Sequence, residues 1–226
     1  VLGAMDGEVA AITRNMEAQR SFEWRGFPVA EGRISGAPVV VSRTGVGKTL
    51  SAMLCQHLID EYAPERIIFT GVAGALHEGL EVGDTVVATD TLQHDMDVTA
   101  LGFAPGQIPY SPHRVFTCDD ALVRVALGLP APHGTAHRGR ILTGDQFIAD
   151  PDRRERLARE LAGDAVEMEG ASVALVATVN EIPFLLIRTI SDHSDGSATS
   201  FETVVELAAE NSWYYLRGVL DQIARG

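Results

Sequence analysis

The stretch from Asp164 to Asp192 constrains the fold more than any other part of the chain, because acidic residues stand at both ends of an apolar run. Its pattern predicts a short extended segment with Glu167 and Glu169 on either side of Met168. A helix of small residues and a buried strand ending at Asp192 are expected to follow. Helix then strand is half of an α/β crossover, and open α/β sheets bind ligands at the carboxyl ends of their strands. Asp192 is therefore expected at the edge of a binding site.

The rest of the chain alternates strand-like and helix-like segments. Strands are expected at 1–5, 27–29, 39–42, 66–69, 85–88 and 140–143, and helices after residue 8 to 16, after 47 to 62, and at 119–127, 151–161 and 201–223. Residues 92–116 lose this periodicity and gain Gly, Pro and His, which is typical of a long loop over a site. Roughly eight strands and six helices predict an α/β three-layer sandwich, with a central mixed β-sheet flanked by helices. Residues 1–226 are expected to form a single domain.

The charge of the chain excludes some classes of partner. Asp and Glu total 31 against 18 Lys and Arg, which gives a formal net charge of -13. A chain this acidic is not expected to bind nucleic acid or an anionic membrane surface, but it can bind a small neutral ligand. Without a signal peptide or an apolar run of about 18 residues, a cytoplasmic protein is expected. The chain starts in strand-like sequence at Val1, so a few residues of the first strand are expected to precede it.

The cysteines and histidines do not indicate a redox or metal site. Cys55 falls inside a predicted helix and Cys118 near a helix start, as expected of ordinary buried thiols. The seven histidines lack a second ligand at the spacings that metal sites use. No metal and no organic cofactor is expected.

Two glycine-rich segments follow predicted strands. Residues 45–49, GVGKT, suggest a nucleotide triphosphatase loop, but the first glycine of that pattern would fall at Ser42. A tight turn whose amides face a ligand or pack the helix start is the better interpretation. Residues 70–74, TGVAG, lack the dinucleotide fingerprint, and both a plain strand-to-loop turn and a ligand contact stay open.

Three carboxylates are candidates for chemistry. Glu167 and Glu169 are two residues apart, so they share a face if the segment is extended. Such a pair can bind vicinal hydroxyls through charge-assisted hydrogen bonds, although a solvated strand face is an equal alternative. Asp192 ends a buried strand, where a perturbed pKa is expected, and it is a candidate acid or base.

Several short segments together carry a resemblance to a known family. They are GAMDGEVA, TGVGK, TGVAGAL, VGD, QHDMDVT, GQIP, GDQFI, VEMEG and IRTISD, in this order over nearly the whole chain. The chain resembles the nucleoside phosphorylase/nucleosidase family, which implies a nucleoside phosphorylase-like fold. Phe69 stands where the hexameric purine phosphorylases carry a phosphate-binding arginine, and residues 3–8 replace the segment that leads to another. The resemblance therefore implies water as the nucleophile.

The branch that the chain resembles most hydrolyses the N-glycosidic bond of 5'-methylthioadenosine and S-adenosylhomocysteine, releasing adenine and a 5'-thioribose product. By resemblance, Asp192 is the general acid that protonates purine N7, Ser191 orients it, and Glu8 activates the attacking water. Another purine nucleosidase with a futalosine-type substrate is the alternative, and a phosphorylase is a weaker one. A non-catalytic nucleoside-binding module would require the loss of Glu8 or Asp192.

The resemblance also implies the substrate contacts. Glu169 binds the ribose 2' and 3' hydroxyls beside Glu167, and Met168 packs under the sugar. The base would be held by Phe147 through stacking, by the backbone of Ile148, and by Ala73 and Gly74.

The 5' substituent would lie in an apolar channel. The channel residues are Val98, Leu101, Phe103 and Pro109, some of them supplied by a neighbouring subunit of a homodimer. Leu101 departs from the family, because this position is often aromatic in the closest relatives. The preference among 5' groups therefore stays open.

Overall fold

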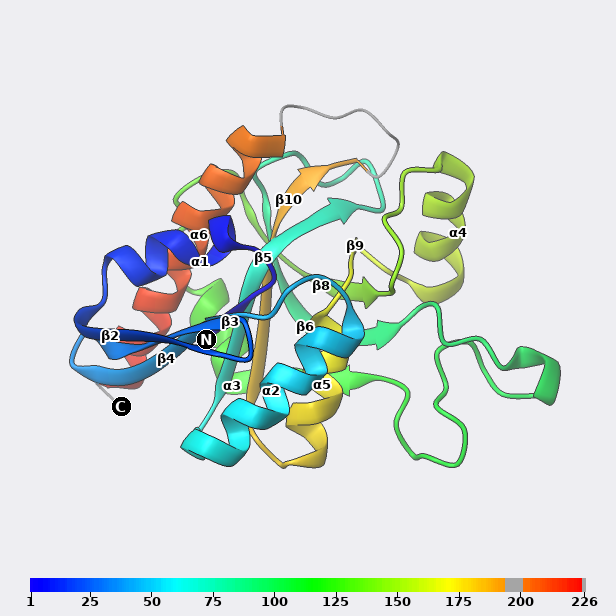
Figure 1. The fold of residues 1–226 in the computed structure, drawn as a ribbon. Helices are drawn as coiled ribbons and strands as arrows, with labels where there is room; N and C mark the ends of the chain where they lie inside the picture. The colour runs from blue at the N-terminus through cyan, green and yellow to red at the C-terminus, as the bar shows by residue number, and fades with distance from the viewer. Residues whose placement is uncertain (194–200, 225–226) are drawn as a thin grey trace.

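The computed structural model of the chain describes residues 1–193 and 201–224 (Figure 1). Six α-helices lie in these residues: α1 (Asp6–Arg14), α2 (Lys48–Tyr62), α3 (Asp120–Leu127), α4 (Pro151–Leu161), α5 (Gly170–Val179) and α6 (Phe201–Ile223). The strands are β1 (Leu2–Gly3), β2 (Glu17–Trp24), β3 (Phe27–Ile34), β4 (Ala37–Arg43), β5 (Ile67–Ala75), β6 (Thr85–Gln93), β7 (Phe116–Thr117), β8 (Ala136–Thr143), β9 (Ala165–Glu167) and β10 (Phe184–Asp192). No helix in these residues has the length and apolarity needed to cross a bilayer.

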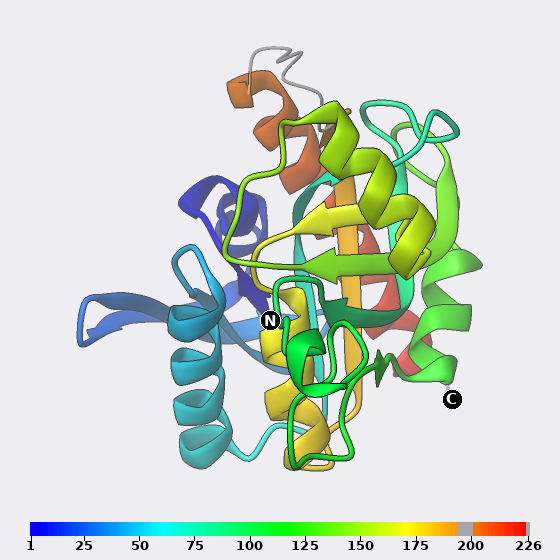
Figure 2. The same cartoon turned by 90° about the vertical axis from the view of Figure 1, so that its right-hand side faces the viewer.

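The strands form one mixed sheet in the order β10-β6-β8-β9-β5-β1-β4-β3-β2, with β7 paired to β6. Strand β10 also pairs with β5, in parallel, along Phe184 to Asp192. The strands β10, β6, β8, β9 and β5 therefore close on themselves, while β1 to β4 extend from β5 as an open, twisted arm (Figure 2). The predicted α/β class with a central mixed sheet is confirmed, and the closure is an additional feature.

Helices cover the closed part of the sheet on both sides. Helix α1 packs against α6, which lies over β5 and β10, and α2 packs against α5 (Figure 1). Helix α5 is apolar on all sides because α2, β6, β7, β8 and β10 surround it. Strand β10 is buried on both faces, which explains its continuous apolar sequence. These contacts fix the end of β10 and the start of α5, where the predicted site lies.

Several strands differ from their predicted extents. Strand β5 continues through residues 70–75, so the strand-to-loop turn considered for TGVAG is wrong. Pairing with β9 and β10 supplies hydrogen-bond partners that keep these glycines extended. Strand β2 is missing from the prediction, because its largely exposed, polar residues show no apolar alternation.

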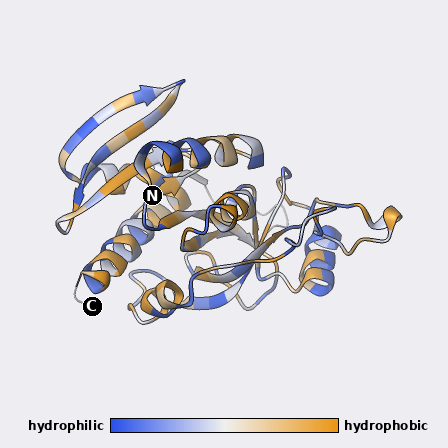
Figure 3. Cartoon of the chain, turned by 90° about the horizontal axis from the view of Figure 1, so that it is seen from below, coloured by the Kyte–Doolittle hydropathy of each residue, from blue (hydrophilic) through white to orange (hydrophobic). Residues whose placement is uncertain are grey.

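The long loop between β6 and β7 is confirmed, although Leu92 and Gln93 still belong to β6. Residues 94–115 extend away from the sheet and end in an apolar tip (Figure 3). Leu101 is 73% exposed and Tyr110 is 99% exposed. Apolar side chains this exposed indicate a surface that another molecule covers.

Candidate active site

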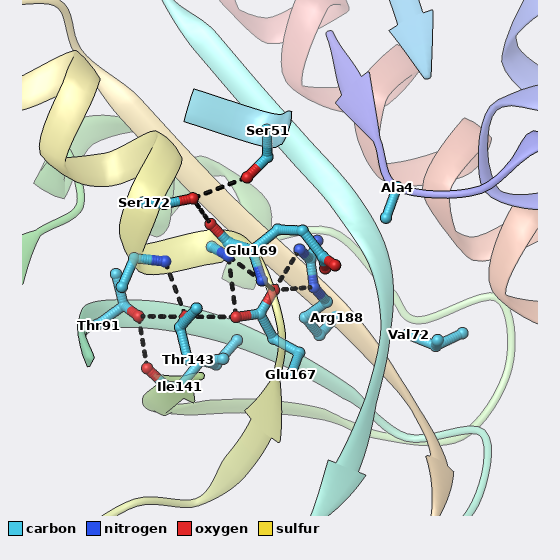
Figure 4. A network of polar contacts seen from close by, with 12 residues as sticks. Ala4, Ser51, Val72, Thr91, Ile141, Thr143, Glu167, Glu169, Ser172 and Arg188 are labelled. Atoms are coloured by element: carbon cyan, nitrogen blue, oxygen red, sulfur yellow. Dashed lines mark hydrogen bonds and ion pairs between the residues drawn. The ribbon is translucent and has the colours of Figure 1, made fainter. Parts of the chain in front are cut away.

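A buried ion pair lies at the centre of the site (Figure 4). Arg188 of β10 is 1% exposed, and its Nη2 donates to Oε2 of Glu167 at 2.6 Å. The guanidinium also lies 4.2 Å from the ring centroid of Phe69. Burying an arginine requires such partners, because an unpaired charge in the interior costs several kcal/mol. Arg188 was not among the predicted site residues, although an arginine inside an apolar strand is itself the sequence signal for a buried ion pair.

The Glu167 carboxylate points into the interior, and both of its oxygens accept hydrogen bonds. Besides Arg188, it accepts hydrogen bonds from the backbone of Glu169 at 3.1 Å, from the backbone of Gly170 at 2.8 Å and from Oγ1 of Thr143. Strand β9 ends at Glu167, and Glu169 already caps α5, so the prediction that the two glutamates share a face of an extended segment is wrong. The amides at the start of α5 and the buried guanidinium draw Glu167 to the interior.

Glu169 is the N-cap residue of α5 and adjoins this network. It is 5% exposed, and its Oε1 accepts a hydrogen bond from the backbone of Gly47 at 2.7 Å. Burial raises its pKa to about 8, helped by the negative charges of Glu167 and Glu8 and opposed by Arg188 and the Gly47 amide. At neutral pH the Glu169 carboxyl is therefore largely protonated and can both donate and accept a hydrogen bond.

The glycine turn before α2 contacts Glu169 directly, through the Gly47 amide. Gly47 has φ +96°, and a Cβ there would lie 3.0 Å from Oδ1 of Asp145. Ser51 of α2 and Ser172 of α5 share a hydrogen bond of 2.7 Å, and Ser172 donates to the Glu169 carbonyl at 2.6 Å (Figure 4). The prediction that the amides of this turn face a ligand or pack the helix start is thus refined, since the Gly47 amide faces a side chain of the site.

Glu8 is the second buried carboxylate of the site and is 2% exposed. Its oxygens accept hydrogen bonds from the backbone of Ala4 at 2.6 Å, Met5 at 2.9 Å and Val72 at 3.0 Å. A Cβ on Gly71 would lie 2.5 Å from Oε1 of Glu8, so only glycine lets β5 approach this carboxylate. Burial raises the pKa of Glu8, and Arg188 and the three amides oppose that rise.

Asp192 ends β10 beside the glycine-rich part of β5. Oγ of Ser191 donates to Oδ2 of Asp192 at 2.7 Å and lies 3.2 Å from the carbonyl oxygen of Ala73. Asp192 itself is in register with Gly74. The structure therefore brings together Ala73, Gly74, Ser191 and Asp192, which were assigned separately to the base pocket and to its acid.

The remaining predicted residues lie on loops. Phe147 is 71% exposed in the loop between β8 and α4, whereas Ile148 is 6% exposed and packs in a small apolar cluster. Met168 is half-buried between the two glutamates. The channel residues Val98, Leu101, Phe103 and Pro109 all lie on the loop 94–115, which projects from the sheet (Figure 1).

The arrangement suits acid-base chemistry on a small polar ligand. Carboxylates lie at the end of β10 and at the start of α1, and a third faces the turn before α2. No group of three or more His, Cys, Asp or Glu residues in the described part of the chain is placed to hold a metal ion. Carboxyl groups in these positions can transfer protons and form hydrogen bonds.

Comparison with known proteins places the chain among nucleoside-cleaving enzymes. The family model described as phosphorylase superfamily matches residues 1–221. A 5'-methylthioadenosine/S-adenosylhomocysteine nucleosidase from Tolumonas auensis is 36% identical, over 99% of this chain and 98% of the relative. The structure of the Neisseria meningitidis enzyme of that name, in complex with methylthio-immucillin-A, has a TM-score of 0.90 and 33% identity, covering 98% of this chain and 97% of that one. Futalosine hydrolase of Helicobacter pylori has a TM-score of 0.90 and 30% identity, covering 98% and 96%.

Proposed function

Because the chain belongs to the phosphorylase superfamily, we propose that its site hydrolyses the N-glycosidic bond of 5'-methylthioadenosine and S-adenosylhomocysteine, releasing adenine and the 5'-thioribose product. The chain is a hydrolase acting on N-glycosyl compounds. Full-length relatives at 36% identity and a solved structure at 33% carry the corresponding name.

The charges in the site favour water over phosphate as the nucleophile. Arg188 is the cation whose charge acts on Glu8 and Glu169, and Glu167 already engages its guanidinium at 2.6 Å. A phosphate would have to displace Glu167 from a buried ion pair and then lie beside two more carboxyl groups. Both steps are unfavourable in a buried site. A neutral water molecule need not displace Glu167 and is not repelled by the carboxyl groups.

Asp192 supplies the proton in this proposal. The adenine anion is a poor leaving group, so protonation of purine N7 lowers the barrier to cleavage, and a placed general acid contributes about 10²–10⁴-fold. Ser191 donates to Oδ2 of Asp192 and thereby favours one orientation of the carboxyl group. The proximity of Ala73 and Gly74 supports a base pocket at the same strand ends.

Glu8 activates the attacking water. Three backbone amides fix its carboxylate, and its raised pKa makes it a stronger base than an ordinary glutamate when it is ionised. Positive charge develops on the ribosyl centre before the water bond is complete. The neighbouring carboxylates therefore favour the transition state over the ground state.

Substrate binding is assigned to the surrounding loops and to α5. Glu169 binds the ribose 2' and 3' hydroxyls, with Glu167 holding its backbone in place, and Met168 packs under the sugar. Exposed Phe147 stacks on the purine, and Ile148 offers its backbone to the adenine edge.

We also propose a homodimer in which the loop 94–115 of one protomer completes the 5' channel of the other. The loop extends away from its own sheet with Leu101 exposed (Figures 1 and 3). A second uncovered apolar surface is formed by Val46, just before α2, and by Leu50 and Met53 in its first turns, which are 41–51% exposed. Sedimentation at several concentrations would test this, and Leu101→Asp should shift the equilibrium toward monomer. The expected cytoplasmic location stays a prediction.

Adenine release from 5'-methylthioadenosine, measured with and without phosphate, tests the function. We expect equal rates in both conditions and methylthioribose as the second product. Release that requires phosphate, with a ribose 1-phosphate as product, would overturn the hydrolase assignment.

A futalosine-type nucleosidase is the second candidate, supported by the likeness to Helicobacter pylori futalosine hydrolase. Comparing kcat/KM for 5'-methylthioadenosine and for futalosine separates the two. A higher value for futalosine would favour the second candidate, while the general acid and the water-activating carboxylate would keep their roles.

A further inference from the structure

Lys48 is the only lysine in the chain, since 17 of the 18 Lys and Arg residues are arginines. It follows the glycine turn at the start of α2, in the GVGKT segment, and no step of the proposed chemistry uses its side chain. That side chain is 17% exposed, and Nζ donates to Oδ1 of Asp95 at 2.7 Å and to Oε1 of Gln93 at 3.0 Å. A largely buried ammonium group that donates to two acceptors holds its side chain in one position, unlike a solvated surface lysine.

Lys48 closes a ring of hydrogen bonds with Asp95 and Asp145. Its backbone N–H donates to Oδ1 of Asp145 at 2.8 Å, and the backbone N–H of Asp145 donates to Oδ2 of Asp95 at 2.9 Å. The hydrogen bond from the Lys48 ammonium group to Oδ1 of Asp95 completes the ring. Burial opposes ionisation of Asp95, but the hydrogen bonds from Lys48 and Asp145 hold its pKa below the ordinary value, so the ring contains an ion pair.

The ring joins three segments that each carry part of the substrate site. Gly47, next to Lys48, donates its amide to Glu169. Asp95 is the second residue of the loop 94–115 and lies three residues before the channel residue Val98. Asp145 precedes Phe147 by two residues. Besides the bond from the Asp145 N–H to Asp95, the backbone N–H of His94 donates to the Thr143 carbonyl at 2.8 Å, so Lys48 adds a side-chain link beyond the end of the β6–β8 pairing.

We propose that Lys48 is a positioning residue that fastens the base of loop 94–115 to the loop after β8 and thereby sets how strongly the enzyme selects nucleosides by their 5' group. This inference rests on the proposed nucleosidase function. Lys48 acts through Asp95 and Asp145, and the effect appears in whichever protomer's site the loop completes. A loop held in its binding conformation loses less entropy when the 5' group docks, so affinity for that group depends on the anchor.

Kinetics of Lys48→Met, Lys48→Arg and Asp95→Asn with 5'-methylthioadenosine and adenosine test the inference. Loss of a charged, largely buried hydrogen bond should raise KM for 5'-methylthioadenosine about ten-fold or more in Lys48→Met and Asp95→Asn. The kcat value, and both constants for adenosine, should stay within about three-fold. Lys48→Arg should restore most of the selectivity, because a guanidinium can reach the same carboxylate.

Asp90→Asn is the matched control. Asp90 lies on β6, five residues before Asp95, is 20% exposed at its side chain and pairs with Arg140 at 2.5 Å, but it lies outside the ring. Its substitution should leave the preference for 5'-methylthioadenosine over adenosine unchanged.

Limited trypsin digestion gives a second measurement that needs no activity. Arg114 is the only Lys or Arg between residues 94 and 115, so cleavage after it reports on the loop. Without ligand, this cleavage should be about ten-fold faster in Lys48→Met and Asp95→Asn than in the parent protein.

The outcomes separate the two proposals. A parent protein that releases no adenine from any nucleoside would overturn the proposed function, and digestion alone would then decide the role of Lys48. With an active parent, equal losses on both nucleosides or an unchanged rate of cleavage after Arg114 would overturn the inference. If circular dichroism shows that Lys48→Met does not fold, Asp95→Asn decides the result.

Discussion

Arg188→Met should be among the most destabilising single substitutions in this protein. The side chains of Arg188 and Glu167 are 2% and 3% exposed and are joined at 2.6 Å, so removing the arginine leaves a buried carboxylate without its counter-charge. Breaking a buried ion pair in this way costs about 3–5 kcal/mol. Methionine roughly conserves the volume over Phe69, so the loss should come mainly from the charge rather than from a cavity.

The size of the effect can be measured by thermal unfolding. At about 2–4 °C per kcal/mol for a chain of this length, the midpoint should fall by roughly 6–20 °C. Arg217→Met is the control, because Arg217 is 60% exposed and its Nε lies 3.7 Å from Asp221, and such a surface pair contributes about 1 kcal/mol at most.

A double-mutant cycle with Glu167→Gln checks the cause. If the loss reflects an unpaired charge, adding Glu167→Gln to Arg188→Met should recover part of it, because the remaining group is then neutral. A fall of less than about 2 °C in Arg188→Met, or strictly additive losses in the double variant, would show that the pair is not the source of stability assigned to it here.

Three further changes test the roles of individual carboxyl groups. Asp192→Asn should keep the fold but lower kcat about 10²-fold or more on 5'-methylthioadenosine, and near-parental turnover would place the acid elsewhere. Glu8→Gln should bind a substrate analogue with near-parental affinity while hydrolysis falls strongly. In the parent, the acid limb of the kcat profile should lie above the ordinary glutamate pKa, because the pKa of Glu8 is raised. The pKa of Glu169 is about 8 in the folded chain against 4.5 for an ordinary glutamate, so its contribution to stability is fully present below pH 4.5 and is lost as pH rises through 8. Urea unfolding from pH 5 to 8 should show this loss in the parent and a smaller one in Glu169→Gln, where Glu8 is the remaining carboxyl with a raised pKa.

Local sequence signals predicted the helices well. Helix α4 begins at Pro151 after Asp150, whose side chain accepts a hydrogen bond from the Arg153 amide, and α3 begins after the N-cap Asp119. Both caps are visible in the sequence, because a short acidic side chain next to a helical pattern is a start signal. Apolar periodicity placed the buried strands for the same reason, and it failed for exposed β2.

The closure of the sheet and the inward turn of Glu167 could not be predicted in this way. Strand β10 meets both β5 and β6 through pairings of residues more than 90 positions apart, and no local pattern encodes such contacts. Glu167 is distinguished from Glu169 by Arg188, which is 21 residues away. Spacing alone made the two glutamates equivalent, and the tertiary ion pair separates them.

The Arg188–Glu167 pair links the stability of the fold to the chemistry of the site. Because Glu167 engages the guanidinium at 2.6 Å, Arg188 only partly offsets the rise in the pKa values of Glu8 and Glu169. The raised pKa makes the Glu8 carboxylate a stronger base than an ordinary glutamate, and Glu169, with a pKa of about 8, keeps at neutral pH the proton with which it donates to a sugar hydroxyl. A cation without such a partner would lower both pKa values further and would also attract phosphate. The same buried pair that holds β9 to β10 thus favours water as the nucleophile.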